Sequence, residues 1–499
     1  MKNQLFYGDN LDVLRKYIKD ESIDLCYIDP PFNSKRNYNQ IYLNQGGEDK
    51  AQAQAFVDTW NWGDRANDEL QELFENSKGL YTKQTIQLIE GLEKVLTRGG
   101  LLAYLISMTL RIAEIHRVLK DTGSFYLHCD PTASHYLKLV CDGIFCAKGG
   151  DLRNEIIWCY SRMAAKGQKQ LSRCHDVVFW YNKGKEWSFD VEKIRLPYAE
   201  TSKARAGYKK TNLGGGSPKS KICELNEGGK FPEDWVQIPF IRGHEYLGYQ
   251  TQKPEALLER FVLASSNKGD TVLDAYCGCG TTIAVAEDLK RNWIGVDITY
   301  QSISLVLRRL TDSFGKSILK NIELNGIPQD FESAVALANK QDDRTRKEFE
   351  KWCILSYTNN KGMIHEKKGK DYGIDGMALI ADINEKQDNE LMPVLFSVKS
   401  DLKPHSSYVR DLIGTMQREK AVMGILITLY EPTRDMITEA KQAGKYKNKL
   451  FNIEFDRVKI VTVSQMLKGD FLNIPQMPKV LKEAKRKQDR EGQLKFNIE

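Results

Sequence analysis

One stretch of the sequence, residues 23–31, restricts the fold more than any other. The apolar run that begins it predicts a buried parallel strand. The run stops at Asp29, and Pro30 and Pro31 follow. Both prolines have a restricted φ angle and no N–H donor, so a strand ladder cannot continue through them. Ligands bind outside the carboxyl ends of strands in an open α/β sheet, which makes Asp29 a candidate site residue.

The residues around this strand end suit the binding of an amino group on a flat ring. Asp29 and the Pro30 carbonyl together offer acceptors for both hydrogens of one amine. Phe32 adds an apolar face on which a planar ring can stack. An ordinary strand-ending turn can contain the same residue types, so the motif needs support from the rest of the chain.

That support comes from two further strands that end in acids. The strand predicted at 271–273 leads to Asp274 and a glycine-containing turn, and the strand at 293–296 ends at Asp297, 23 residues after Asp274. Glycines let the backbone approach a ligand at such a turn, and an acid at this distance is suited to ribose hydroxyls. A first strand at 4–7 also ends beside an acid, Asp9. The pattern predicts a doubly wound α/β sheet.

Other segments are predicted from periodicity and composition. Residues 33–80 are polar and aromatic and are expected to form a long loop, whereas 81–96 and 101–119 have the spacing of amphipathic helices. We expect domains at 1–325 and 345–470, a connector at 326–344 and a charged tail at 471–499 that forms an exposed, fraying helix.

Positive charge is concentrated in one segment. Residues 162–221 contain 14 basic and 5 acidic residues, a net +9 that leaves −3 for the rest of a chain whose total is +6. A solvated charged face would show the same excess. Interleaved aromatic residues favour a nucleic-acid surface instead. These are Trp158, Tyr160, Phe179, Trp180, Tyr181 and Trp187.

The bulk composition indicates a cytoplasmic protein. No run approaches the roughly 20 apolar residues of a membrane span, and the first residues lead straight into a predicted strand rather than a signal-peptide core. The ten cysteines include no Cys-x-x-Cys pair, so buried free thiols are expected and zinc is not.

The order of the motifs resembles the β class of permuted DNA amino-methyltransferases, which transfer a methyl group from S-adenosylmethionine to an exocyclic nitrogen. Asp29-Pro30-Pro31-Phe32 resembles the catalytic motif of that class. A target-recognition insertion at about 150–245 comes next, followed by Thr251-Gln252-Lys253-Pro254 and the loop after Asp274. The resemblance covers residues 4–312 and implies a Rossmann-like methyltransferase sheet that acts on double-stranded DNA.

The resemblance also implies roles for individual residues. The catalytic residues would be Asp29, Pro30, Pro31 and Phe32. The cofactor would be held by Asp9, Asn10, Lys253, Asp274, Tyr276, Gly278, Gly280, Thr281, Thr282 and Asp297. An Asp before the two prolines favours adenine N6 over cytosine N4. If the protein dimerises, the interface is expected in the methyltransferase domain.

The C-terminal part resembles the Mrr-like branch of the PD-(D/E)xK restriction-endonuclease fold. Asp375 precedes one predicted strand and Lys399 ends the next, as in a Mg²⁺ nuclease site with Asp375 as the metal ligand. Ser397 replaces the usual carboxylate or amide two residues before the lysine. Glu348 or Glu350, on the preceding helix, is a candidate substitute.

Three hypotheses follow for the whole chain. The first is an adenine-N6 DNA methyltransferase whose fused nuclease domain gives restriction activity. The second is a solitary methyltransferase, for adenine N6 or cytosine N4, whose C-terminal domain only binds DNA or assists assembly. The third is a non-catalytic nucleic-acid binder with a relict cofactor fold. RNA stays open as a substrate, and the recognition sequence cannot be derived from residues 150–245.

Overall fold

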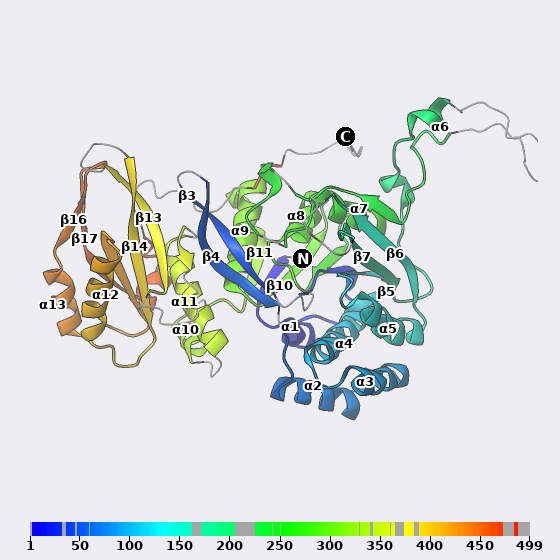
Figure 1. The fold of residues 1–499 in the computed structure, drawn as a ribbon, viewed down its shortest axis with the longest axis horizontal. Helices are drawn as coiled ribbons and strands as arrows, with labels where there is room; N and C mark the ends of the chain where they lie inside the picture. Colours follow the sequence, from blue (N-terminus) through cyan, green and yellow to red (C-terminus); the bar gives the residue numbers. More distant parts are fainter. Residues whose placement is uncertain are drawn as a thin grey trace, which may run out of the picture.

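The computed structural model describes most of the chain in two α/β units. Its described residues are 2–31, 36–44, 47–58, 60–161, 171–204, 225–241, 243–249, 251–328, 330–339, 343–359, 361–364, 374–383, 389–472 and 484–487. A large sheet and a smaller one lie side by side, with α10 (Phe331–Ala338) and α11 (Asp343–Tyr357) between them (Figure 1).

The large sheet has nine strands and a parallel centre. The strands from β11 to β5 run parallel, and β7 is antiparallel to both of its neighbours. Their order is β11 (Ile322–Asn325), β1 (Asn3–Tyr7), β10 (Asn292–Asp297), β9 (Thr271–Asp274), β2 (Ile23–Ile28), β5 (Leu119–Cys129), β7 (His175–Asn182), β6 (Asp151–Cys159) and β8 (Trp235–Gln237). This arrangement confirms the predicted doubly wound α/β class.

Helices cover both faces of this sheet, which explains why its strands are apolar throughout. The helices α1 (Asn10–Tyr17), α4 (Gly100–Val118) and α5 (Ser134–Ile144) cover one face, and α7 (Glu255–Ser265), α8 (Thr281–Asp288) and α9 (Tyr300–Phe314) cover the other (Figure 1). Successive residues of β1 join opposite cores: Leu5 packs toward α7–α9 and Phe6 toward α1 and α4. The predicted helix at 101–119 is confirmed by α4.

The predicted loop at 33–80 was wrong. The structure has β3 (Arg36–Asn44) and β4 (Gly47–Asp58) as an antiparallel pair, followed by α2 (Asp64–Glu75), which packs on α4. Helix α2 buries Ala66, Leu70 and Leu73, whose i, i+4, i+7 spacing is helical. Three apolar positions among charged residues were too few to indicate a helix in the sequence. Helix α3 (Lys83–Leu96) follows and agrees with the prediction for 81–96.

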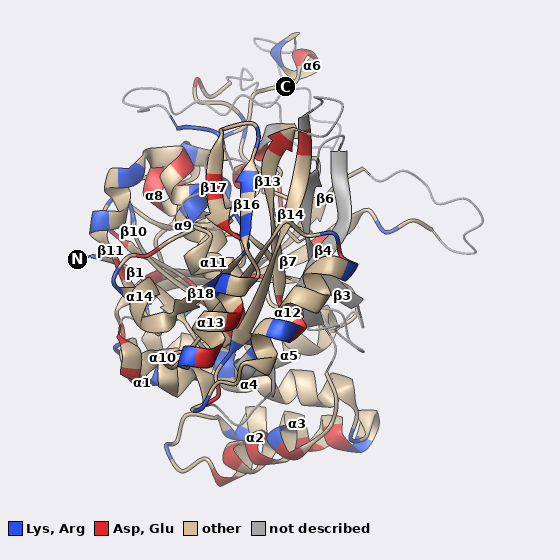
Figure 2. Cartoon of the chain, turned by 90° about the vertical axis from the view of Figure 1, so that its left-hand side faces the viewer, with Lys and Arg blue, Asp and Glu red and all other residues tan. Residues whose placement is uncertain are grey.

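Acidic residues are frequent on α2 and α3, at the edge of the molecule drawn lowest in Figure 2. The acids on these two helices are Asp64, Asp68, Glu69, Glu72, Glu75, Glu90 and Glu93. Arg65, Lys83 and Lys94 lie on the same two helices and leave them with a net charge of −4, which disfavours the approach of a polyanion to this edge.

The predicted insertion at about 150–245 is partly built into the large sheet. Strands β6, β7 and β8 extend the sheet beyond β5, and short α6 (Glu200–Ala204) projects away from the body (Figure 1). Residues 162–170 and 205–224, which include much of the basic segment, lie outside the described residues. The sequence-based domain boundaries therefore stay predictions.

The C-terminal unit has a five-stranded sheet. Its order is β12 (Met363–Ile364), β13 (Gly376–Ile383), β14 (Asn389–Lys399), β15 (Met423–Thr428) and β18 (Val458–Thr462). The helices α12 (Ser407–Arg418) and α13 (Arg434–Gln442) share one apolar core with this sheet, and α11 packs in another. The remaining elements are β16 (Lys445–Asn448), β17 (Ile453–Asp456) and α14 (Val463–Leu467). The predicted C-terminal α/β unit is confirmed.

The described part of the tail is not the exposed helix that the sequence predicted. Residues 484–487 have no helical structure and lie against the large domain. The Ala484 N–H donates to Asp312 at 3.2 Å, and Lys487 Nζ donates to Glu255 at 2.6 Å and Asp288 at 3.3 Å. Acids on three helices thus hold a segment that sequence composition alone suggested would be solvated. In the described part of the chain, no helix is both long and apolar enough to cross a bilayer.

We predict that Trp293→Ala will destabilise the large domain by about 3–5 kcal/mol, because the substitution opens a large cavity. Trp293 is 1% exposed on β10, and its indole Nε1 donates to Glu287 at 2.8 Å. The matched control is Trp235→Ala on edge strand β8, where the ring is 52% exposed and about 0.5 kcal/mol or less is expected. Urea unfolding measures both, and equal effects would contradict the assigned packing.

Candidate active site

A cavity of about 310 Å³ opens at the carboxyl edge of the large sheet. Four acids that follow neighbouring parallel strands reach it, because parallel strands all end on the same edge. Most residues predicted for the site line it, namely Asp9, Asn10, Asp29, Pro30, Pro31, Lys253, Asp274, Tyr276, Gly278, Thr281, Thr282 and Asp297. Gly280 is the N-cap of α8 behind this wall. Phe32 lies outside the described residues.

Asp29 is held from one side only. Lys253 Nζ, in the segment just before α7, forms an ion pair with Asp29 Oδ2. The other oxygen, Oδ1, is buried and has no hydrogen-bond partner among the described residues. A buried acceptor without a partner is costly unless a ligand completes it. Asp29 lines the cavity, and its carboxylate is thus fixed in place with one buried acceptor that has no partner among the described residues.

The turn between β9 and α8 requires its glycines. Gly278 and Gly280 have φ angles of +47° and +73°, a region that residues with a Cβ seldom adopt. A Cβ on Gly280 would lie 2.9 Å from Val306 Cγ2. The Gly278 N–H donates to Asp297 Oδ2 at 2.9 Å, which joins this turn to the end of β10.

Two of the acids retain protons more strongly than usual. Burial raises the pKa of Asp274 to about 7, although it accepts hydrogen bonds from Thr282 and from Tyr276 N at 3.1 Å. Burial also raises the pKa of Asp297 to about 6, against donors that include Thr299 N at 2.9 Å. A cationic or hydroxyl-bearing ligand beside these carboxylates would relieve the cost of burying them.

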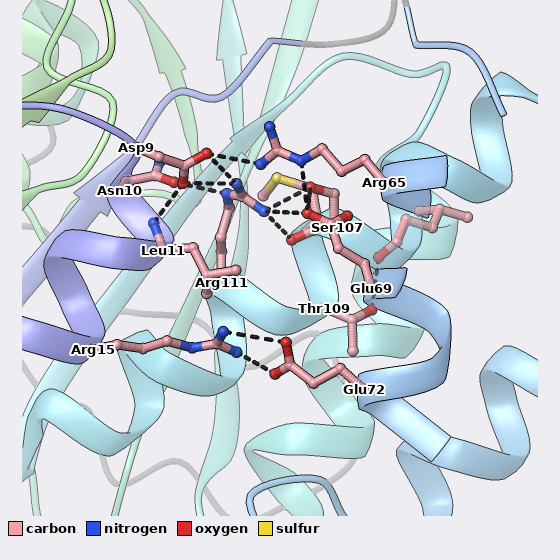
Figure 3. A network of polar contacts seen from close by, with 12 residues as sticks. Asp9, Asn10, Leu11, Arg15, Arg65, Glu69, Glu72, Ser107, Thr109 and Arg111 are labelled. Carbon is pink, nitrogen blue, oxygen red and sulfur yellow. Dashed lines mark hydrogen bonds and ion pairs between the residues drawn. The ribbon is translucent and has the colours of Figure 1, made fainter. Parts of the chain in front are cut away.

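Asp9 is instead the centre of an ion-pair network. Figure 3 shows Arg65 and Arg111 pointing toward it from α2 and α4, with Nη2–Oδ distances of 2.7 and 3.0 Å. Burial opposes ionisation, but the two guanidinium charges outweigh it and lower the pKa of Asp9 to about 2. Asp9 also caps α1 through Leu11 N at 2.9 Å, and Asn10 Nδ2 donates to Ala275 O at 2.9 Å. These two predicted cofactor residues therefore also join the end of β1 to α2, to α4 and to the turn after β9.

Several wall residues were missed in the sequence. Arg111 is 4% exposed and donates to Asn10 Oδ1 at 2.7 Å and to Ser107 Oγ at 2.6 Å. A lone arginine inside an apolar helix was the available signal, since a buried charge needs partners. Trp60, Arg65 and Tyr249 also line the cavity, but they come from segments whose local sequence has no strand or turn motif.

A hydrogen-bonded chain leads from the cavity to the added strands. The Tyr27 hydroxyl, which lines the cavity, lies 2.9 Å from His128 Nδ1. His128 Nε2 lies 3.4 Å from Asp176 Oδ2, and Tyr160 donates to the other Asp176 oxygen at 2.9 Å. His128 is fully buried, so the structure gives it the role of linking β2, β5 and β7.

The predicted nuclease residues converge at one end of β13 and β14. Asp375 Oδ2 accepts from Val398 N at 2.6 Å, and the Asp375 N–H donates to Phe396 O at 2.9 Å. Ser397 is buried beside this pair, and Lys399 Nζ lies 5.5 Å from the centre of the Tyr408 ring. The two strands therefore bring Asp375, Ser397 and Lys399 into one neighbourhood.

The proposed carboxylate substitutes differ. Both oxygens of Glu348 are engaged elsewhere, because Oε2 accepts from Tyr300 N at 2.8 Å in the large domain and Oε1 pairs with Lys351 at 2.9 Å, so that alternative was wrong. Burial raises the pKa of the Cys353 thiol, and the charges of Glu350 and Asp375 act in the same direction. Among the described residues, no three His, Cys, Asp or Glu side chains gather as a metal-binding group. Mg²⁺ can bind through one or two carboxylates when water and substrate phosphates complete its coordination. Asp375 and Glu350 would be those carboxylates here.

Replacing Asp274 should change the pH dependence of stability. Its pKa is about 7 when folded against 3.8 in the reference state, so its stabilising contribution is complete below about pH 4 and is lost as pH rises through 7. The melting temperature of Asp274→Asn should fall less between pH 5 and pH 8 than that of the wild type. The exposed Asp68→Asn is the control, and equal slopes in all three proteins would contradict the assignment.

Comparison with known proteins agrees with this geometry. The sequence model for a DNA methylase family matches residues 23–308, more than half of the chain, and one described as restriction endonuclease matches residues 342–455. The DNA adenine methyltransferase YhdJ of Escherichia coli (strain K12) is 29% identical over 311 residues, 61% of this chain and 82% of the relative. The type II methyltransferase M.BglII of Bacillus subtilis is 32% identical over 222 residues, 42% of this chain and 59% of the relative.

Solved structures also match the large domain. The complex of M1.HpyAVI with SAM is 16% identical and covers 63% of this chain and 98% of its own, with a TM-score of 0.34. The cytosine-N4-specific PvuII DNA methyltransferase is 16% identical and covers 65% and 95%, with a TM-score of 0.36. The match of the family model over more than half of the chain leads to one conclusion: the chain belongs to the DNA methylase family and carries a restriction-endonuclease-like domain at its C-terminal side.

Proposed function

We propose that the protein transfers a methyl group from S-adenosylmethionine to the N6 amine of adenine in double-stranded DNA. The observation that carries this proposal is the half-satisfied Asp29, which lines the cavity and whose buried Oδ1 has no hydrogen-bond partner among the described residues. Adenine is favoured over cytosine by the Asp in the Asp-Pro-Pro motif and by the relative YhdJ, which is named a DNA adenine methyltransferase.

The cavity suits the methyl donor chemically. Asp297 presents a carboxylate at the end of β10, where ribose hydroxyls are held in such folds. Asp274 would face a cationic amino group, and Gly278 lets the backbone come close. When bound, the donor supplies an activated methyl group on a sulfonium.

Asp29 and Lys253 then define what the protein itself contributes. The exocyclic amine of adenine is a poor nucleophile because its lone pair is delocalised into the ring. Asp29 Oδ1 and the Pro30 carbonyl would accept its two hydrogens and localise the lone pair. Lys253 occupies the other Asp29 oxygen and so restrains the carboxylate while it accepts. Alignment of this kind lowers the activation barrier by several kcal/mol, and no covalent enzyme intermediate is needed.

The target base has to leave the helix to reach this site. Asp29 lies at a cavity wall, and a base stacked in a duplex cannot present its amine there, so the nucleotide must be flipped out. The net negative charge of α2 and α3 disfavours that edge for DNA, and the added strands β6–β8 lie at the opposite end of the strand order from β11.

Replacing Asp29 with Asn should reduce methyl transfer by roughly 10²–10⁴-fold, because the amide that replaces the carboxylate is neutral and pairs poorly with both Lys253 and the target amine. The assay uses labelled S-adenosylmethionine and unmethylated double-stranded DNA, followed by digestion to nucleosides. N6-methyladenine should appear with the wild type and with the control Asp68→Asn.

The same assay separates the alternatives. Methylcytosine in the product would keep the site and overturn the choice of base. Transfer to RNA but not to DNA would overturn the substrate. Equal activity of wild type and Asp29→Asn would remove Asp29 from the mechanism.

We further propose that the C-terminal domain hydrolyses DNA with the help of a divalent cation. The supporting observation is that Asp375, just before β13, accepts from the Val398 N–H on β14, next to Lys399, in the segment matched as a restriction endonuclease. Asp375 and Glu350 would hold the cation, and Lys399 would orient the attacking water. Ser397 supplies only a hydroxyl, so the site relies on fewer carboxylates than usual.

Cleavage of unmethylated DNA should require Mg²⁺ and should be lost in both Asp375→Asn and Lys399→Met, while methyl transfer continues. Asp435→Asn is the control, because Asp435 is exposed at the start of α13 in the same domain. Cleavage that survives both substitutions would exclude this site. No cleavage by the wild type would favour a domain that binds DNA or assists assembly.

The expected dimer through the methyltransferase domain also stays a proposal. Light scattering coupled to size-exclusion chromatography would decide it, and a monomer at working concentrations would overturn it.

A further inference from the structure

The N-terminus of α9 forms part of the proposed cofactor site. Asp297, Ile298 and Thr299 line the cavity just before the helix begins. Thr299 caps the helix and also binds Asp297 Oδ1 through its N–H at 2.9 Å and its hydroxyl at 3.0 Å. The position of Asp297 therefore depends on how the first turn of α9 is held.

A residue from the other domain holds that turn. Glu348 Oε2, on α11, accepts from the N–H of Tyr300, the first residue of α9, at 2.8 Å. Burial raises the pKa of the Tyr7 hydroxyl and the Glu348 charge acts in the same direction, and Tyr7 pairs in register with Asp297 in the sheet. Glu348 thus binds the turn after Asp297 and acts on the strand residue paired with it.

The contact is buried and charged. Glu348 and Lys351 are 6% and 7% exposed, and Lys351 Nζ lies 2.9 Å from Glu348 Oε1. Removing one partner of a buried pair leaves the other charge uncompensated. A second contact joins the same helices, because the Tyr300 hydroxyl lies 3.0 Å from Ser356 Oγ.

The residues of this contact belong to two different family matches. Glu348 and Ser356 lie in the segment matched as a restriction endonuclease, whereas Tyr300 lies in the segment matched as a DNA methylase. One apolar core also contains residues of α9, α11, β13 and β14. Helix α11 therefore packs against both domains, rather than only connecting them.

We propose that Glu348 is a positioning residue for the methyltransferase, through which docking of the nuclease-like domain and cofactor binding are energetically coupled. The inference rests on the proposed function, because it takes the cavity beside Asp297 as the cofactor site. Coupling between two sites is reciprocal. A docked α11 strengthens cofactor binding, and the bound cofactor in turn tightens the docking of α11.

The test uses the full chain and S-adenosylhomocysteine as the probe, with binding measured by isothermal titration calorimetry. Glu348→Gln keeps the size of the side chain but removes the charge, and its Kd should rise at least about fivefold. Ser356→Ala should give a smaller increase. Glu332→Gln, an exposed position on neighbouring α10, is the matched control and should bind within about twofold of the wild type.

Hydrogen exchange provides the second readout and does not depend on activity or on any variant. In the wild type, amides of residues 343–357 should exchange more slowly when S-adenosylhomocysteine is bound. This measurement and Ser356→Ala decide the matter if Glu348→Gln does not fold. Unchanged affinity in Glu348→Gln with unchanged exchange in α11 would overturn the coupling alone. A wild type that binds no S-adenosylhomocysteine would overturn the proposed function and the coupling with it.

Discussion

The structure depends on how four carboxylates are accommodated at one edge of a parallel sheet. Parallel strands deliver their last residues to the same side, so the acids that follow β1, β2, β9 and β10 share one cavity. Charges of one sign so close together, and partly buried, are unfavourable without compensation. Asp9 is compensated by Arg111, Asp29 by Lys253, and Asp297 by backbone N–H groups.

These compensating groups come from distant parts of the chain. Arg111 lies on α4, Lys253 precedes α7, and the donors to Asp297 belong to the turns before α8 and α9. The site therefore exists only when the whole doubly wound domain has formed. Among the described residues, Asp29 is the one acid with a buried oxygen that has no partner, and it is the acid proposed to bind the target amine.

The same logic extends to the C-terminal domain. Helix α11 contributes a buried acid, Glu348, to the N-terminal turn of α9, and this turn carries the Thr299 that binds Asp297. In the described tail, Lys487 donates to one oxygen of Glu255, and Arg309 donates to the other. Arg309 also donates to Thr281 Oγ1 at 3.0 Å. The segments after the methyltransferase sheet thus contact the layer of residues behind its cavity.

The sequence by itself determined the α/β class, the strand-ending acids and part of the cavity wall, because a strand followed by Asp and two prolines, or by Asp and glycines, has few other local structures. It did not reveal the helix at 64–75, whose apolar positions are sparse. Only the tertiary structure showed that Lys253 pairs with Asp29, that Arg111 pairs with Asp9 and that Glu348 faces α9 rather than Asp375. Local patterns record which face of an element is buried, whereas the partner of a buried charge is decided by which distant element packs against it.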